Sequence, residues 1–309
     1  MTQAALIGLG TMGPGIAATL SHGGVAVRAA DAQPAAVERA RTAVEAAYGV
    51  LDRLGVAPGP SGQAPVVFCD DLASALHGAT LVIENVPENA DVKTALYRAI
   101  DPLIGPDVIV ATDTSGIPIT TLQAAISHPE RFVGMHWSNP PHIIPMIEVI
   151  AGAQTSPATV ETIVGLIRQL KLLPVVVKKD IPGFVENRVL YALLREVVAL
   201  VEDGVIDPED IDTCVSWGIG YKLGVVGPMA LLDMAGLDIY QSVSSFLNKD
   251  LSTRSDVAPF VKTKTEQGRL GVKTGGGVYD YTPERIKALQ AERAAKFVAV
   301  RRILEGRDR

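Results

Sequence analysis

The stretch that decides the fold is residues 4–31, AALIGLGTMGPGIAATLSHGGVAVRAAD. An apolar run is followed by a G-x-G-x-x-G turn at residues 8–13 and by an alanine-rich helical pattern that reaches about residue 23. A second apolar run, residues 25–30, ends at Asp31. Strand, glycine turn, helix, strand and acid therefore follow one another in the order of a dinucleotide-binding βαβ unit.

The glycine turn predicts where the pyrophosphate of a dinucleotide binds. Gly8 permits the tight turn, Gly10 lets the pyrophosphate approach the backbone at the helix N-terminus, and Gly13 allows the helix to pack on the strand. Thr11 and Met12 complete the turn, and we predict that they contact the cofactor as well.

Asp31 predicts which cofactor is bound. A carboxylate at the end of the second strand can bind both ribose hydroxyls and repels a 2′-phosphate, which favours NAD over NADP. Arg28 is nearby, but it precedes the acid and would have to reach around the strand to contact such a phosphate.

The composition excludes several classes of protein. The 309 residues are 48% hydrophobic, but they contain no apolar run near the ~18 residues that a membrane helix needs. A net charge of −6 and the lack of a basic run argue against binding to nucleic acid. Two cysteines and no Cys/His cluster indicate neither a disulfide framework nor a metal site. The chain enters a strand at once, without the pattern of a signal peptide, so we expect a cytoplasmic enzyme.

Apolar strand-like runs alternate with helical patterns up to about residue 180, which is typical of a doubly wound, mostly parallel sheet. After the first two, the expected strands are residues 66–68, 81–86, 108–112, 132–135, 146–150 and 175–178. Beyond residues 180–183 only long helical patterns follow. We therefore predict an α/β fold, with a Rossmann-type NAD-binding domain over residues 1–181 and an all-α domain over residues 182–309.

His136 and Glu148 form a candidate catalytic pair. His136 ends the apolar run 132–135, Glu148 lies inside the run 146–150, and three prolines between them exclude a regular helix. If the two runs pair in a sheet, the carboxylate can fix the imidazole tautomer and make the other nitrogen a better base. The alternative is a histidine at a strand end that makes one structural hydrogen bond. The dinucleotide-binding pattern at the N-terminus favours the catalytic interpretation.

Six motifs together resemble the 3-hydroxyacyl-CoA dehydrogenase superfamily: GLGTMG with Asp31, IENVPEN–ADVK, TDTSG, HWSNPP with Glu148, PGFVENR and RLGVKTGGGVYDY. They occur in the superfamily's order from residue 4 to about residue 282. The resemblance implies hydride transfer between an alcohol or carbonyl carbon and NAD. It also implies that His136 is the base, steered by Glu148.

The same resemblance implies roles for other residues. Ser115 and Asn187 would hydrogen-bond the reacting oxygen, although Ser115 could instead belong to a simple turn and Asn187 could be a helix cap. Lys93 taken alone would be a solvated helix residue. The implied contacts around the nicotinamide and its ribose are Pro87, Glu88, Lys93, Ser115 and Asn139.

Residues 45–65 depart from the superfamily's pattern in a way that concerns the substrate. Members that take CoA thioesters usually carry a lysine-bearing helical excursion here, which holds the CoA phosphates. This chain has one base in the stretch, Arg53, beside the acids Glu45 and Asp52. Little positive charge is available for several phosphates, which disfavours a CoA thioester.

Residues 220–228 form a longer turn than the acyl-CoA enzymes have, and they are similar to the L-gulonate and carnitine dehydrogenase branches. Those branches act on small carboxylates and place an arginine where Lys222 stands. We predict that Lys222 binds a substrate carboxylate, with His142 as the next candidate, against the alternative of a solvated loop lysine. Two further departures are Asp113, where an asparagine is usual, and Trp137-Ser138, where an aromatic pair is usual.

Three functions stay open. The first is NAD-dependent oxidation of a small anionic aldehyde, as its hydrate, to the acid, with dismutation possible. It is favoured because HWSNPPHIIPMIEVI, DIPGFVENRVLYALLRE and CVSWGIGYKLGVVGPMALLDMAGLDIY are similar to a branch from bacterial vitamin B6 breakdown. The second is a 3-hydroxyacyl-CoA, L-gulonate or L-carnitine dehydrogenase. The third is a non-catalytic, crystallin-like NAD-binding protein, against which the intact pair of His136 and Glu148 argues. We also expect a homodimer through the helical domain, because the superfamily uses that domain for dimerisation.

Overall fold

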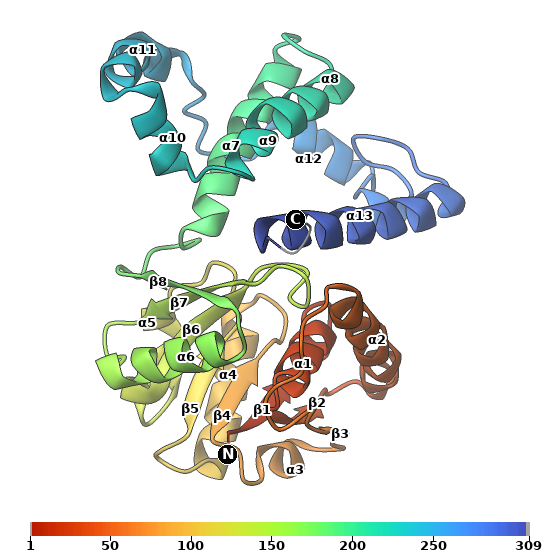
Figure 1. Cartoon of the computed structure of the whole chain (residues 1–309), viewed down its shortest axis with the longest axis vertical. Coiled ribbons are helices and arrows are strands. Elements are labelled where there is room, and N and C mark those ends of the chain that lie inside the picture. The colour runs from red at the N-terminus through yellow and green to blue at the C-terminus, as the bar shows by residue number, and fades with distance from the viewer. Residues whose placement is uncertain (1, 307–309) are drawn as a thin grey trace. The chain divides into compact units, whose positions relative to one another are not determined.

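The computed structural model describes residues 2–306, which divide into two compact units between Asn187 and Arg188 (Figure 1). The first unit includes residues 182–187, which the sequence analysis placed in the second domain. These residues belong with the first unit because the backbone of Val185 and Glu186 is hydrogen-bonded to Glu148 of the sheet.

The first unit is built on one eight-stranded sheet with the order β3-β2-β1-β4-β5-β6-β7-β8. All neighbouring strands pair in parallel except β6 and β7, which are antiparallel. The strands are β1 Gln3–Ile7, β2 Ala26–Ala30, β3 Val66–Phe68, β4 Leu81–Glu84, β5 Ile109–Thr112, β6 Phe132–Trp137, β7 Met146–Ala151 and β8 Leu173–Val177. The predicted mostly parallel sheet is confirmed, and its order reverses between β1 and β4, where such folds bind their ligands.

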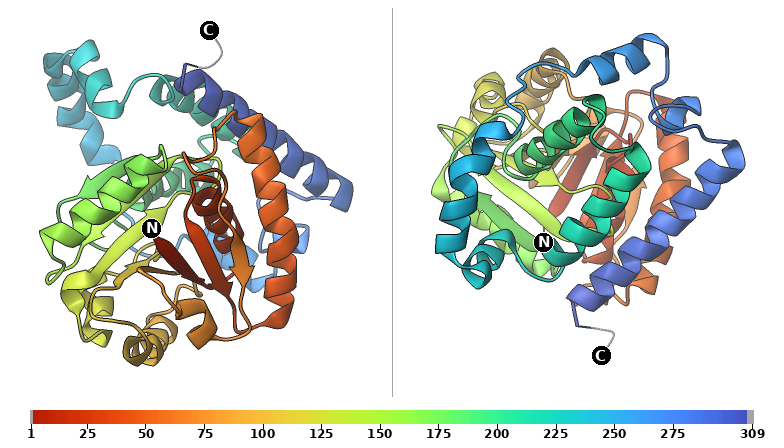
Figure 2. Two further views of the ribbon diagram at one scale, coloured as in Figure 1. Left: turned by 60° about the horizontal axis from the view of Figure 1, so that its bottom comes forward. Right: turned by 90° about the horizontal axis from the view of Figure 1, so that it is seen from above.

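Helices cover both faces of this sheet (Figure 2). Side chains alternate along β1, so that Leu6 packs in the core with Ile16 and Leu20 of α1, while Ile7 packs in the core with Tyr97 of α4. The helices are α1 Gly13–His22, α2 Pro34–Arg53, α3 Leu72–Leu76, α4 Ala90–Ile100, α5 Ile119–Leu122 and α6 Pro157–Gln169.

α2 continues to Arg53, and Val50 and Leu51 in its last turns are buried. One strand boundary differs from the sequence-based expectation. β8 begins at Leu173 and includes Pro174, which a strand tolerates at the edge of a sheet, where β8 lies.

The second unit is helical, as expected, and its described part contains only two isolated β-bridges besides helices and loops. Its helices are α7 Glu186–Glu202, α8 Pro208–Thr213, a π-helix Cys214–Gly220, α9 Tyr221–Leu223, α10 Pro228–Ala235, α11 Leu237–Asp250, α12 Pro259–Glu266 and α13 Pro283–Leu304. The expected long turn over residues 220–228 is shorter than predicted, because the helical path runs on through Leu223. Among residues 2–306 no single helix has the length and apolar composition of a membrane span, although the bent pair Pro208–Leu223 and Pro228–Ala235 passes both criteria together.

Candidate active site

The glycine turn between β1 and α1 has the geometry that a dinucleotide needs. Gly8 has a φ of 101°, and a Cβ atom there would lie 2.6 Å from the backbone of Asn85. A Cβ atom on Gly13 would lie 2.4 Å from the carbonyl oxygen of Gly8, so the helix starts in contact with the turn. A Cβ atom on Gly10 would meet nothing within 4 Å. The turn is therefore closed where it packs and open where a pyrophosphate would approach.

Asp31 lies directly after β2 and is joined to the glycine turn. Its Oδ2 accepts a hydrogen bond from the backbone N–H of Leu9 at 2.7 Å, and its Oδ1 accepts one from the N–H of Gln33 at 2.8 Å. The carboxylate thus stands beside the turn, at the position expected for a partner of the adenosine ribose.

Replacing Asp31 with serine should weaken NAD binding by about one to two decades, the equivalent of one hydrogen bond to a charged group. The same change should reduce the preference for NAD over NADP, because the repulsion of the 2′-phosphate is lost. Calorimetric titration of both cofactors into both proteins measures the two effects. Wild-type protein that binds NADP as tightly as NAD would contradict the role of Asp31.

The other predicted cofactor contacts lie on one edge of the sheet. Those that follow the carboxyl ends of the parallel strands β1, β4, β5 and β6 are exposed: Gly10, Thr11, Pro87, Ser115 and Asn139. Met12 is half-buried at the start of α1. This edge, at the point where the strand order reverses, is where doubly wound folds bind dinucleotides.

His136 and Glu148 lie directly opposite each other in the antiparallel pair of β6 and β7. His136 Nδ1 is 2.8 Å from Glu148 Oε2, and both side chains are buried. The other oxygen of Glu148 accepts hydrogen bonds from the backbone N–H groups of Val185 at 2.9 Å and Glu186 at 3.1 Å. Because an ionised carboxylate only accepts hydrogen bonds, Nδ1 donates and Nε2 is left free to take a proton.

The surroundings shift the pKa of each partner. Burial alone would lower the pKa of His136, but the hydrogen bond to Glu148 and the nearby charges of Glu148 and Glu186 act in the opposite direction, and the net effect raises that pKa. Burial alone would raise the pKa of Glu148, but hydrogen bonds from His136, Glu186 and Val185 outweigh it and lower that pKa. The pair therefore combines an ionised orienting acid with a histidine of increased basicity.

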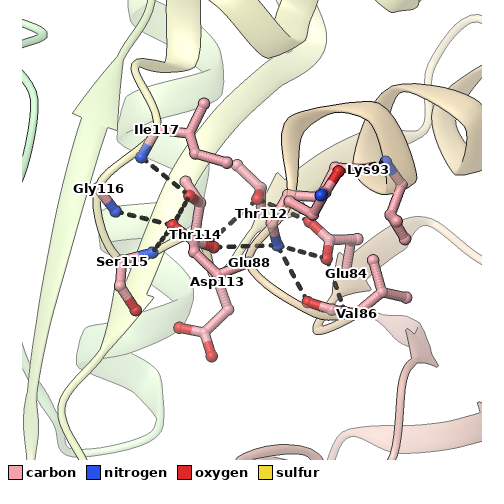
Figure 3. Close-up of polar contacts among 12 residues, drawn as sticks. Glu84, Val86, Glu88, Lys93, Thr112, Asp113, Thr114, Ser115, Gly116 and Ile117 are labelled. Carbon is pink, nitrogen blue, oxygen red and sulfur yellow. Dashed lines mark hydrogen bonds and ion pairs between the residues drawn. The ribbon is translucent and has the colours of Figure 1, made fainter. Parts of the chain in front are cut away.

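Glu88 holds the loop that carries Ser115 (Figure 3). Its Oε1 accepts hydrogen bonds from Thr114 Oγ1 at 2.6 Å and from the N–H groups of Ser115 and Gly116 at 3.0 Å each. The Ser115 side chain points away from Glu88, and the Ser115 carbonyl accepts a 2.7 Å hydrogen bond from Asn187 Nδ2. The structure thus brings Ser115 and Asn187 together, with Glu88 as the support of their loop.

Lys93 lies beneath this loop rather than on the surface. The Lys93 side chain is 1% exposed, and its Nζ lies 2.7 Å from Glu84 Oε1, 3.3 Å from the Val86 carbonyl and 3.5 Å from Glu88 Oε2. Glu84 Oε2 accepts hydrogen bonds from Tyr97 at 2.5 Å and Thr112 at 2.8 Å. The interpretation of Lys93 as a solvated residue is wrong, because this network holds its charge in the interior.

Glu84, Tyr97 and Thr112 were missed by the sequence analysis. The available signal was Glu84 itself, a charged residue at the end of the apolar run LVIE. A buried acid needs a cation and hydrogen-bond donors, and Lys93 was the nearest lysine along the following helix.

Asp113 fills the place of the usual asparagine with a carboxyl group of shifted pKa. Burial raises the pKa of Asp113 to about 8, although the hydrogen bond from the Trp137 N–H and the charge of His136 act in the opposite direction. A protonated Asp113 can both accept from Trp137, at 2.7 Å, and donate, as an asparagine does.

Asp113→Asn should therefore flatten the pH dependence of stability. A carboxyl whose folded-state pKa lies above its usual 3.8 contributes stability that is fully present below pH 3.8 and lost as the pH rises through about 8. Relative to wild type, the variant should gain ~1–3 kcal/mol in its free energy of unfolding between pH 5 and pH 8. Urea unfolding of both proteins across this range measures the difference, and parallel curves would contradict the shifted pKa.

His142 lies in the loop between β6 and β7 and packs against α1. A Cβ atom on Gly15 would be 2.8 Å from His142 Nδ1, which is buried without a hydrogen-bond partner among the described residues. Burial lowers the pKa of His142, and a neutral ring gives little charge to a carboxylate. Its position beside the first turn of α1 places it near the glycine turn.

Glu186, which lies beside the pair of His136 and Glu148, was also missed by the sequence analysis. Its Oε1 accepts a short hydrogen bond from Ser138 Oγ. His136, Glu148 and Glu186 each offer one possible metal-ligand atom, and these three atoms lie within 4.8 Å of one another. Among residues 2–306, this is the one set of three His, Cys or acidic side chains close enough for a metal ion. In it, His136 and Glu148 already share a hydrogen bond.

Two family models cover most of the chain. A model of the NAD-binding domain of 3-hydroxyacyl-CoA dehydrogenase matches residues 3–181, and a model of the C-terminal domain matches residues 183–281. The chain belongs to the 3-hydroxyacyl-CoA dehydrogenase family. It is an NAD-dependent dehydrogenase, and the glycine turn and Asp31 fit the cofactor.

Named relatives lie in more than one branch of this 3-hydroxyacyl-CoA dehydrogenase family. The chain is 70% identical over 304 residues, 98% of both chains, to 5-formyl-3-hydroxy-2-methylpyridine 4-carboxylate 5-dehydrogenase of Mesorhizobium japonicum. A solved structure of an enzyme of that name, described as an NAD⁺-dependent dismutase, matches with a TM-score of 0.98, 69% identity and complete coverage of both chains. A probable 3-hydroxybutyryl-CoA dehydrogenase of Bacillus subtilis is 34% identical over 286 residues, 90% of this chain and 97% of the relative.

Proposed function

We propose that this dehydrogenase oxidises the aldehyde of 5-formyl-3-hydroxy-2-methylpyridine-4-carboxylate to the acid. The observation that carries the choice of substrate is the 70% identity, over 98% of both chains, to the Mesorhizobium japonicum enzyme that bears this substrate's name. The buried pair of His136 and Glu148 supports an active dehydrogenase rather than a non-catalytic NAD-binding protein.

The reaction that fits these residues begins with the hydrate of the aldehyde. A hydrated aldehyde is formally an alcohol, and His136 Nε2 can take the proton of one hydroxyl while Glu148 holds the Nδ1 proton. Ser115 and Asn187 would hydrogen-bond the reacting oxygen, since their loop and helix are tied together at 2.7 Å. NAD, held by the glycine turn and Asp31, supplies the acceptor for the hydride that leaves the same carbon.

The same residues also serve the reverse hydride transfer. A protonated His136 can return its proton to the oxygen of a second aldehyde as that aldehyde becomes an alcohol. Oxidation of one aldehyde and reduction of another would together be a dismutation, the activity in the description of the solved relative.

A panel of substrates tests the proposal. Purified protein with NAD is given the pyridine aldehyde, L-gulonate or L-carnitine, and protein with NADH is given acetoacetyl-CoA; absorbance of NADH and chromatography of the products are followed. We expect the pyridine aldehyde to be the preferred substrate by kcat/KM. Efficient turnover of acetoacetyl-CoA with none of the pyridine aldehyde would overturn the proposal.

Lys222 supplies a candidate partner for the substrate carboxylate. It lies in α9 with an exposed side chain, so its ammonium is available to a ligand. A hydrogen bond between this cation and a carboxylate is worth roughly 1.5–3 kcal/mol. Lys222→Met should therefore raise KM for the aldehyde by about one to two decades and leave NAD affinity unchanged. Steady-state kinetics measures the effect, and Lys249→Met, at another exposed position, is the matched control. An unchanged KM in Lys222→Met would show that another residue binds the substrate carboxylate.

We also infer a homodimer formed through the second unit, in a reducing compartment such as the cytoplasm. No residue described in α7, α10 or α11 is buried, and many of their large apolar side chains are exposed, including Met229, Met234 and Phe246. A surface of this kind is typical of a subunit interface. Both cysteines are free thiols, as is usual for proteins of a reducing compartment. Light scattering of the purified protein measures the mass, and a monomer at micromolar concentration would contradict the dimer.

A further inference from the structure

Glu186 places a second carboxylate beside the catalytic histidine. It is the first residue of α7, and its backbone N–H donates to Glu148 Oε1 at 3.1 Å, which fixes the start of the helix against β7. One of its carboxylate oxygens accepts from Ser138, which follows β6 directly. Two contacts from neighbouring strands therefore hold Glu186 in the catalytic site.

The other oxygen of Glu186, Oε2, is buried and has no hydrogen-bond partner among the described residues. Removing a carboxylate oxygen from water without giving it a donor is costly, so such an atom in an active site indicates a missing partner. Since a carboxylate accepts and cannot donate when ionised, the partner must bring an O–H or N–H group. The negative charge of Glu186 also acts on His136, as one of the charges that raise the pKa of its imidazole.

At its reacting carbon, the proposed substrate carries such a group only in its hydrated form. The hydrate, R–CH(OH)₂, carries two hydroxyls, of which His136 deprotonates one. The free aldehyde carries a single oxygen that accepts hydrogen bonds, and a carboxylate beside it would be repulsive. A fixed acceptor next to His136 therefore distinguishes the hydrate from the aldehyde by the second hydroxyl alone.

We propose that Glu186 Oε2 accepts a hydrogen bond from the second hydroxyl of the aldehyde hydrate and so favours binding of the hydrate over the free aldehyde for oxidation. The inference rests on the proposed function. In the balanced step, one hydroxyl of R–CH(OH)₂ loses its proton to His136, the carbon loses a hydride to NAD⁺, and the products are R–COOH and NADH. The second hydroxyl becomes the O–H of the acid, and when that acid ionises, Glu186 repels the carboxylate and favours its release.

The test compares the two directions of hydride transfer in Glu186→Leu. Leucine fills a similar volume but accepts no hydrogen bond. Initial rates are measured for oxidation of the pyridine aldehyde with NAD⁺ and for its reduction with NADH, each expressed per concentration of hydrate or free aldehyde, which NMR determines. Oxidation should fall by about one to two decades, the equivalent of one charge-assisted hydrogen bond. Reduction should not fall, because the free aldehyde makes no hydrogen bond to Glu186 and is repelled by its carboxylate.

Glu186→Gln and Ser138→Ala complete the set. Glutamine keeps an uncharged acceptor, so oxidation should fall by about half as many decades as in the leucine variant. Both Glu186 variants lose a negative charge near His136, so the acidic limb of the kcat/KM profile should move to lower pH. Ser138→Ala leaves Oε2 in the site and should cost oxidation less than Glu186→Leu does. If leucine prevents folding, as circular dichroism would show, the loss in oxidation is compared with the loss in reduction in the glutamine variant instead.

An equal loss in both directions, or no loss in either, would overturn the role of Glu186 while leaving the proposed function intact. A wild-type protein that neither oxidises nor reduces the pyridine aldehyde would instead overturn the proposed function itself.

Discussion

Replacing His136 with glutamine should lower kcat for aldehyde oxidation by a factor of order 10² to 10⁴, the range for losing a general base. Glutamine approximates the size of the ring but cannot take a proton at neutral pH. The affinity for NAD should stay unchanged, because the base acts only in the chemical step. Glu148→Gln should reduce kcat in the same range, since it removes the acceptor 2.8 Å from Nδ1 and leaves the tautomer unfixed.

The exposed His128 provides the matched control, and His128→Gln should leave kcat unchanged. The pH profile gives a second measurement. Because the pKa of His136 is raised above 6.5, activity in oxidation should fall as the pH drops through a value above 6.5, where the base becomes protonated. A His136→Gln enzyme that keeps about a tenth of the wild-type kcat would exclude His136 as the base.

Replacing Lys93 with methionine should destabilise the first unit by roughly 3–5 kcal/mol, the usual effect of removing one partner from a buried ion pair. Methionine fills much of the volume, so the effect reports the charge that Glu84 is left to carry alone. Glu84 is 0% exposed, and of its partners only Lys93 is a cation. Urea unfolding followed by circular dichroism measures the loss, and Lys178→Met, at an exposed position, should change stability by less than about 0.5 kcal/mol.

The double variant Glu84→Gln/Lys93→Met separates charge from packing. If the unpaired charge causes the loss, the double variant should be more stable than Lys93→Met alone, and the two substitutions should be strongly non-additive. A loss below about 1 kcal/mol in Lys93→Met would show that Glu84 does not depend on its cation. The KM of Lys93→Met for NAD would then test the alternative, in which Lys93 contacts the cofactor directly.

Much of the fold could be predicted because it depends on local patterns. The glycine turn, the helix after it and Asp31 lie within one short stretch, and Gly8 and Gly13 stand where a Cβ atom would meet the backbone. The pairing of His136 with Glu148 was predictable for a similar reason. Two apolar runs separated by a proline-rich loop are typical of neighbouring strands, and the alternation of side chains then decides which residues meet.

The rest of the site depends on contacts that no local pattern expresses. Glu84 meets Lys93, Tyr97 and Thr112, which come from a helix and from another strand, so the sequence shows a buried acid without showing its partners. Glu186 approaches His136 only because β7 holds the start of α7 through Glu148. The helical path through Leu223 was missed because the resemblance to the L-gulonate and carnitine branches indicated one long turn over residues 220–228, whereas the backbone stays helical as far as Leu223.

In this account, His136 is the base in the NAD-dependent oxidation of the hydrated pyridine aldehyde. The most direct measurement is the rate at which the acid forms, followed by chromatography, for wild type and His136→Gln with saturating NAD and the pyridine aldehyde. We expect steady formation of the acid by wild type and a rate lower by a factor of order 10² to 10⁴ in the variant. Acid formation at similar rates by the two proteins, or none by wild type, would contradict the claim.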